Sequence, residues 1–341
     1  MKIKSFMKVL NVGKYAAMAA LLMGTMVACS DDDDDDNGGG NNSQFETPKY
    51  EGEAAKYVID DQRTSPYKSI ELTASGNFII QPSEYVNNAP QKVPVASKKN
   101  MLQRLAGMMN AHISMPETRY EVYSLIAYGK YTKTGENHYN LEGFGTLTIN
   151  KDANGTVRSI VLTTAGKHPE EYTAHRQNTN INSDMSNKLC RTWCIESYRY
   201  YAKINGKTYV DLAADTFAEM ITKMYNWSKK NDPDFDESEW DDMEDMKNDP
   251  TPENVIFTKT GTYIVLYSNK QLAVSTWIWQ DEKNGILRYS WNPDNFNDYD
   301  EAGDVKIEFK NNRLHLTEGD FDYEDGESYE EGLTYIMTEV K

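Results

Sequence analysis

Alternating apolar and polar positions along most of the chain predict a mainly β fold. The clearest signal is at 69–80, where two β-rich runs flank the turn residues 74–77. Further strands are predicted in the first half over 120–132, 138–149 and 157–163. In the second half they are predicted over 188–201, 207–210, 255–267, 272–279, 285–291, 305–310, 314–317 and 332–340. This second set is a meander of about eight strands, which is enough to close a barrel.

Three segments have a composition or spacing that predicts helix. Residues 53–59 (EAAKYVI) predict a short helix, and apolar residues recur at helical spacing over 98–111. Residues 211–230 place large apolar side chains on one face of about five turns. We expect this last segment to be an amphipathic helix inserted into the second β unit.

The chain contains an internal repeat. Residues 70–80 (IELTASGNFII) and 255–265 (VIFTKTGTYIV) share apolar, threonine, glycine and aromatic positions in register; we call them the first and second repeat hairpins. Downstream, 145–149 (GTLTI) parallels 303–307 (GDVKI). The glycine in each hairpin supplies the positive φ that a tight turn needs. The repeat predicts that both halves of the chain are variants of one antiparallel β unit.

The N-terminal residues have the pattern of a secretory signal. Four lysines precede an apolar run over 15–27, which is too short to span a bilayer as a mature helix. Six aspartates over 31–36 and a Gly- and Asn-rich stretch over 37–42 follow. These residues have nothing apolar to bury, so we expect a charged, flexible tether.

Residues 26–30 (MVACS) resemble a bacterial lipoprotein signal, with Met26 where leucine is more usual. The resemblance implies that Cys29 is lipidated and becomes the new N-terminus. Acyl chains on it would hold the protein to a membrane through burial of CH₂ groups, at roughly 0.8 kcal/mol each. Ser30 and the aspartates resemble the export signal of surface lipoproteins in Bacteroidetes, which implies anchoring on the outer face of the outer membrane.

These patterns divide the chain into five parts. We expect a signal peptide over 1–28, a tether over 29–43, an N-terminal β-rich domain with a helix over 44–166, a polar linker over 167–187 and a β-barrel domain over 188–341.

The net charge of −17 changes the range of expected partners, and loss of the four signal-peptide lysines takes it to −21. Such a surface argues against nucleic acid and anionic lipid as partners. It fits a solvated surface protein or one that binds cations. Oligomeric state is left open by the sequence.

The second domain resembles the lipocalin-like domains of Bacteroidetes lipoproteins, through its opening at 189–193 (LCRTW) and its late meander over 261–279. In that family a tryptophan near the first strand packs across the closed barrel end. Trp193 matches that tryptophan, whereas Arg191 stands where the family has glycine. The resemblance implies a barrel that holds an apolar molecule or has no known ligand.

Aromatic side chains of the second domain are the candidate ligand-binding residues: Trp277, Trp279, Trp291, Tyr263 and Tyr289. Strand alternation puts Trp277 and Trp279 on the same face. Filling the core is the favoured interpretation, and a stacking platform for sugars or the wall of an apolar cavity is the alternative.

Asp232, Asp234 and Asp236 alternate as the oxygen ligands of a calcium loop do. An EF-hand would then need glycine and glutamate where Glu237 and Met243 stand. The pattern therefore favours a solvated acidic loop over a metal site.

The sequence contains no recognisable catalytic motif. The five histidines stand in no metal-ligand spacing, and there is neither a nucleophile elbow nor a glycine-rich phosphate loop. We expect a non-enzymatic, cofactor-free surface lipoprotein that binds a small apolar ligand or a glycan fragment. The alternatives are an accessory protein that contacts another surface protein through its acidic tracts, and a glycan hydrolase using two carboxylates.

Overall fold

The structure is a computed structural model of the chain. It describes residues 45–83, 85–86, 89–90, 126–164, 166–178, 181–231, 235–240, 243, 247, 250–269, 272–290, 296, 302–324 and 327–340. The predicted signal peptide and tether, Cys29, and the helix predicted over 98–111 lie outside these residues.

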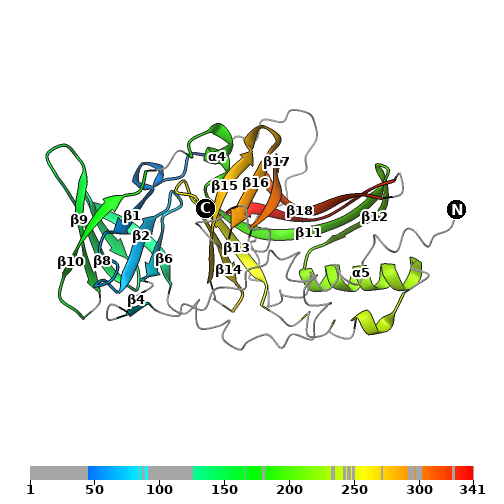
Figure 1. The fold of residues 1–341 in the computed structure, drawn as a ribbon, viewed down its shortest axis with the longest axis horizontal. Helices are drawn as coiled ribbons and strands as arrows, with labels where there is room; N and C mark the ends of the chain where they lie inside the picture. The colour runs from blue at the N-terminus through cyan, green and yellow to red at the C-terminus, as the bar shows by residue number, and fades with distance from the viewer. Residues whose placement is uncertain are drawn as a thin grey trace.

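Eight antiparallel strands form a closed barrel between residues 55 and 176 (Figure 1). Each strand pairs with the next one in the ring, and the last pairs with the first. The strands are β1 (Ala55–Ile59), β2 (Tyr67–Leu72), β3 (Asn77–Pro82), β6 (Ala127–Gly135), β7 (His138–Leu141), β8 (Gly145–Lys151), β9 (Val157–Thr164) and β10 (Glu170–Arg176). The short pair β4 (Tyr85–Val86) and β5 (Ala89–Pro90) forms a separate two-stranded sheet.

A second closed ring of eight antiparallel strands lies between residues 192 and 339. Its strands are β11 (Thr192–Ile204), β13 (Pro252–Phe257), β14 (Thr262–Tyr267), β15 (Leu272–Asp281), β16 (Ile286–Ser290), β17 (Ala302–Lys310), β18 (Arg313–Glu324) and β19 (Glu327–Glu339). Among the described strands, β12 (Lys207–Ala214) pairs with β11 alone and lies outside the ring. The prediction of a mainly β fold with two antiparallel β units is therefore confirmed.

The inserted amphipathic helix is α5 (Phe217–Asn231), which follows β12 and packs against β11 and β12 (Figure 1). It buries Phe217, Met220, Ile221 and Met224. Residues 211–214, which the pattern assigned to the helix, belong to β12. Among the described residues, no helix is both long and apolar enough to cross a membrane.

Short helical elements connect the strands elsewhere. They are η3 (Glu51–Glu53), α4 (Asp184–Leu189), η6 (Glu237–Trp240) and η7 (Glu282–Asn284). Ser183 caps α4, since its hydroxyl accepts a hydrogen bond from the Ser186 backbone N–H at 3.0 Å.

Two local predictions differ from the structure. The helix predicted over 53–59 is wrong, because 55–59 form β1, where every second side chain is buried in the first barrel. Strand β10 lies inside the predicted linker 167–187. Of its seven residues only Ala174 is buried, so the sequence there shows no apolar alternation.

The two repeat hairpins have the same turn. Gly76 and Gly261 both have φ of +81°, and each donates its N–H at 3.1 Å to the backbone oxygen of the threonine three residues before it. Those threonines, Thr73 and Thr258, each also accept a hydrogen bond on their hydroxyl from the first residue of the following strand, at 2.9 and 3.0 Å. The matched residues therefore form the same hydrogen-bonded turn in both barrels.

The equivalence continues through the rest of each ring. Tyr131 and Trp277 donate their N–H groups to Gly76 and Gly261 at 2.8 Å, so β6 and β15 are equivalent strands. Ile149 and Ile307, which end the second pair of matched segments, likewise each donate to the turn of the preceding hairpin. The prediction of one β unit used twice is confirmed at the level of strand order and hydrogen bonding.

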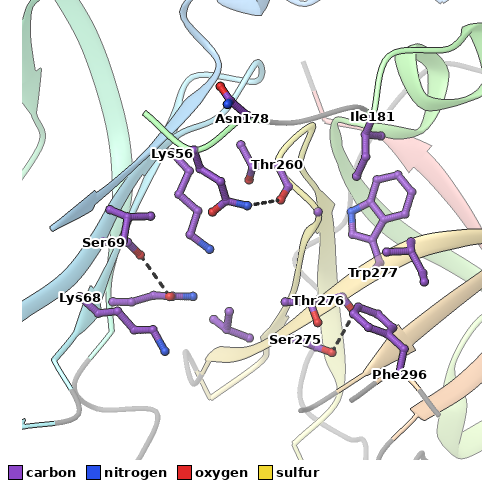
Figure 2. Close-up of a pocket in the computed structure, with 16 residues that line it drawn as sticks. Lys56, Lys68, Ser69, Asn178, Ile181, Thr260, Ser275, Thr276, Trp277 and Phe296 are labelled. Carbon is purple, nitrogen blue, oxygen red and sulfur yellow. Dashed lines mark hydrogen bonds between the residues drawn. The ribbon is translucent and has the colours of Figure 1, made fainter. Parts of the chain in front are cut away.

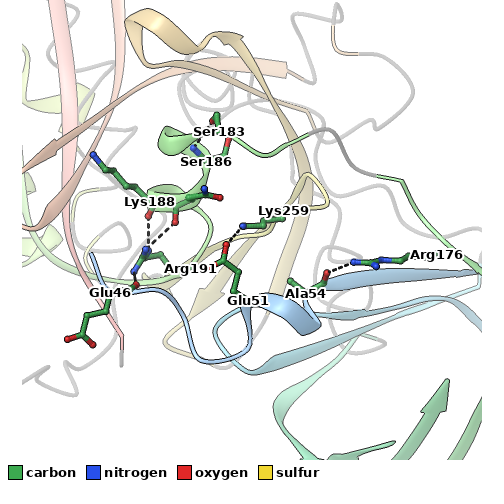
Figure 3. A network of polar contacts seen from close by, with 10 residues as sticks. Glu46, Glu51, Ala54, Arg176, Ser183, Ser186, Lys188, Arg191 and Lys259 are labelled. Atoms are coloured by element: carbon green, nitrogen blue, oxygen red, sulfur yellow. Dashed lines mark hydrogen bonds and ion pairs between the residues drawn. The ribbon is translucent and has the colours of Figure 1, made fainter. Parts of the chain in front are cut away.

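The segment that precedes β1 is fixed to the second barrel through Arg191 (Figure 3). This side chain is 3 % exposed, and its guanidinium lies over the Phe45 ring at 5.0 Å. It donates to the Glu46 carbonyl at 2.9 Å and to the Glu339 carboxylate at 2.7 Å. Phe45 in turn meets the fully buried Trp193 edge-on, with ring centroids 5.5 Å apart. The start of the described chain is thereby held against the second barrel.

Replacement of Arg191 by leucine should destabilise the protein by about 3 kcal/mol or more. The change leaves the Glu339 carboxylate and several carbonyl groups without their donor in a largely buried site. Arg158→Leu is the matched control, because the Arg158–Asp152 pair has an arginine side chain that is 68 % exposed. We expect it to cost less than about 1 kcal/mol. Urea unfolding of both variants measures the difference, and equal losses would contradict the role given to Arg191.

Candidate functional site

The two barrels meet through their repeat hairpins, and we call this contact region between the barrels the joint. Ile79 of β3 packs in one apolar cluster with Ile256, Ile264 and Leu272 of the second barrel. Neighbouring residues on the same strands point into the barrels, so these strands are apolar on both faces. Burying each such side chain contributes roughly 1.5–3 kcal/mol. The continuous apolar runs in the repeat hairpins are the sequence signature of this joint.

A buried carboxylate forms the polar half of the joint. Glu71 of β2 is 1 % exposed, and its two oxygens accept hydrogen bonds from the hydroxyls of Thr260 and Thr262, the second at 2.8 Å. The Lys56 ammonium donates to the Thr262 hydroxyl at 3.4 Å. Buried charge is costly unless it is hydrogen-bonded, so these threonines are what allow Glu71 to lie between the barrels.

Three more contacts cross the joint. Lys259 forms an ion pair with Glu51, as Figure 3 shows. The Gln177 side chain donates to the Thr260 carbonyl at 3.4 Å, and the Thr192 hydroxyl donates to the Asn77 side chain at 3.4 Å. The barrels are therefore tied together at several separate points.

Beside the joint, the barrels enclose a cleft of about 520 Å³ (Figure 2). This volume is in the range of small-molecule sites. One wall comes from β1, β2 and β3 of the first barrel, and the other from β15 and the turn before β14. The lining residues are Lys56, Val58, Lys68, Ser69, Gln81, Gln177, Asn178, Ile181, Thr260, Gly261, Val274, Ser275, Thr276, Trp277, Ile278 and Phe296.

Strand alternation turns several of the lining side chains outward, toward this cleft. In β1, Ala55, Tyr57 and Ile59 point into the first barrel, so Lys56 and Val58 point out of it. In β15, Trp277 and Trp279 pack in the core of the second barrel. Thr276 and Ile278, which alternate with these two tryptophans along the strand, therefore face outward, and Ile278 is 38 % exposed.

The lining combines ammonium, amide and hydroxyl groups with an apolar patch. Some of the polar groups are already paired: Ser69 donates to Gln81 at 3.2 Å and Ser275 to the Ser290 carbonyl at 2.6 Å. None of the sixteen described lining residues is an aspartate, glutamate or histidine. The chemistry of this wall suits hydrogen bonding to a polar ligand.

The predicted aromatic set lies mainly inside the second barrel. Trp277 and Tyr289 are buried, and Tyr263 and Trp279 pack against the same core. Ring centroids are 5.6 Å apart for Trp277 and Trp279 and 5.9 Å apart for Tyr263 and Tyr289. Trp291 lies outside the described residues. The structure thus brings four of the five together, and only Trp277 also borders the cleft.

The described cavity beside these rings is small. The cavity beside Tyr263 has a volume of about 30 Å³, which is room for about one water molecule. Burial, together with the nearby Glu318 carboxylate, raises the pKa of Tyr263, so its hydroxyl stays protonated at neutral pH. In the described barrel the aromatic side chains act as core.

The candidate calcium ligands are mostly outside the described residues. Asp236 is described, whereas Asp232 and Asp234 are not. Across the described part of the chain, no group of three or more His, Cys, Asp or Glu side chains could hold a metal ion.

Of the cleft residues, the sequence analysis identifies only Trp277 as a candidate. The alternation that places Lys56 outward was interpreted as a helix, and Gln177 and Asn178 were assigned to the linker. The one available signal is the pair of apolar runs in the repeat hairpins, which marks where the barrels join.

Comparisons of the chain with protein families, with curated proteins and with solved structures found no match.

Replacing both Thr260 and Thr262 by valine should destabilise the protein by about 2–4 kcal/mol, because Glu71 would stay buried without its two donors. Adding Glu71→Leu to this double variant should recover most of the loss, since an apolar group needs no donor. Denaturant unfolding of the two variants is the measurement. If Glu71→Leu brings no recovery, the threonines do not act through the carboxylate.

Proposed function

We propose that this protein is a non-enzymatic binding protein whose ligand site is the cleft between its two barrels. The observation that carries the proposal is the 520 Å³ cleft, which is far larger than the described cavity of about 30 Å³ beside Tyr263. A ligand of the usual small-molecule size fits the cleft and does not fit the cavity beside Tyr263. The second barrel follows the lipocalin-like resemblance in its strand meander, but the ligand site that we propose lies on its outside.

The kind of ligand follows from the cleft wall. Amides from Gln81, Gln177 and Asn178 lie with hydroxyl groups on one side of the space, and Ile278 offers an exposed apolar surface on the other. A glycan fragment presents hydroxyl groups and apolar ring faces together. Of the two ligand classes expected from the sequence, this wall favours the glycan fragment over the apolar molecule.

Two carboxylates would be needed for the alternative of glycoside hydrolysis. The described lining supplies hydroxyl, amide and ammonium groups to the cleft instead. Binding without chemistry is therefore the activity that we propose for it.

The cellular setting of this activity rests on the sequence. We propose that Cys29 carries the lipid, and that the tether over 29–43 holds the barrels at the outer face of the outer membrane. A site between two water-facing barrels would then be open to ligands outside the cell.

Thermal-shift measurements should find a ligand class that stabilises the mature protein. A ligand at a hundred times its Kd adds about 2.7 kcal/mol. The panel holds neutral and acidic oligosaccharides, fatty acids, bile acids, haem and calcium. Val58→Trp, which fills the cleft from β1, should remove the shift. Thr146→Trp, an exposed position on the same barrel and outside the cleft, should keep it.

Two results would contradict the cleft proposal. A shift that survives Val58→Trp would place the ligand elsewhere, and an absence of shift across the panel would favour the accessory role, in which the protein contacts another surface protein.

Cys29→Ala should abolish lipid attachment. In cells fed a labelled fatty acid, we expect the wild-type protein to carry label and fractionate with the outer membrane. The variant should carry none, because the thiol is the acyl acceptor in the proposed signal. Ser30→Ala is the matched control and should remain labelled. Labelled Cys29→Ala protein would show that the anchor is elsewhere.

A further inference from the structure

Lys56 is a half-buried lysine of the cleft wall with an unusual environment. Its ammonium donates to the Thr262 hydroxyl at 3.4 Å, and among the residues that the structure describes no carboxylate lies within ion-pair distance of it. Two other partly buried lysines do have such a partner: Lys203 meets Glu330 at 2.8 Å, and Lys259 pairs with Glu51. A lysine that is partly removed from water and has no carboxylate in ion-pair contact favours a bound anion.

The nearest carboxylate does not face the cleft. Glu71 lies opposite Lys56 in the β1–β2 ladder, but it is 1 % exposed. Both of its oxygens accept hydrogen bonds from threonine hydroxyls. Glu71 offsets part of the positive charge of Lys56 from the buried side of the joint. The ammonium group lies on the cleft side, where a ligand would contact it.

The charge of the cleft contrasts with the rest of the chain. The protein has a net charge of −17, and about one residue in six is acidic. The sixteen described residues that line the cleft include two lysines and no acid. Figure 2 shows the Lys56 and Lys68 side chains extending from neighbouring strands into the space between the barrels. An anion would find this cleft more favourable than the surrounding acidic surface.

We propose that the ligand of the cleft is an acidic saccharide whose anionic group binds the Lys56 ammonium. This inference rests on the proposed function, since it names the ligand class of the same site. The Lys68 side chain belongs to the same lining, and the amides of Gln177 and Asn178 lie there to bind sugar hydroxyls. The exposed side chain of Ile278 lies against the apolar face of a sugar ring.

The test compares matched acidic and neutral probes by isothermal titration calorimetry on the mature protein. The pairs are a hyaluronan tetrasaccharide and its carboxyl-reduced form, sialyllactose and lactose, and trigalacturonate and its carboxyl-reduced form. A chondroitin 6-sulfate tetrasaccharide and its unsulfated form share their carboxylates, so the difference between them measures the contribution of sulfate. We expect at least one acidic probe to bind about tenfold or more tightly than its neutral partner, with an affinity that falls as salt is raised.

Variants assign the preference to one side chain. Lys56→Gln should weaken the acidic probe about tenfold or more and leave the neutral partner within about twofold. Lys56→Arg keeps the charge and should retain the preference. Lys167→Gln, at an exposed lysine outside the cleft, removes the same charge and should change neither affinity.

The outcomes separate the two proposals. Neutral probes that bind as tightly as acidic ones, or a Lys56→Gln variant that keeps the preference, would overturn the acidic-saccharide inference while the cleft remained a binding site. Absence of binding by every saccharide, acidic or neutral, would also overturn the acidic-saccharide inference. The cleft proposal is overturned separately, by a thermal shift that survives Val58→Trp or by the absence of a shift across the whole panel.

Discussion

The packing of one repeat hairpin against the other is the contact on which the rest of the molecule depends. Ile79, Ile256 and Ile264 are outward-facing side chains of closed barrels, and in an isolated barrel they would meet water. Burying them against each other is what holds the two rings together. The cleft exists because this contact covers only part of the facing surfaces, so the barrels diverge beside it.

Both barrels are built from the same unit, yet the joint is not made of identical residues. Glu71 in the first repeat hairpin aligns with Ile256 in the second. The first is a carboxylate held by threonine hydroxyls and the second lies in the apolar cluster. The shared hydrogen bonds at Gly76 and Gly261 preserve the turn, while the outward positions are free to differ. The joint between the two similar barrels therefore has one polar and one apolar half.

The width of the barrel explains why the aromatic residues and the proposed site are separated. A barrel of eight strands has an interior just wide enough for side chains to fill. Trp277, Tyr263 and Tyr289 pack inside the ring, and the described cleft lies outside it. The cleft takes its charge from Lys56 on β1 and its apolar surface from Ile278 on β15. Neither barrel alone supplies both.

The sequence by itself determined the β fold, the repeat and the inserted helix α5. Strand alternation, turn glycines and helical spacing are local patterns, so they survive in a single chain. It did not determine β1, because five residues are too few to separate strand from helix until neighbours pair with them. It did not determine β10 either, because only one of its seven residues is buried. Only the tertiary structure decided the cleft. Lys56, Gln177 and Thr276 come from distant parts of the chain, and they face one space because two closed barrels pack through their hairpins, a long-range contact that no local pattern encodes.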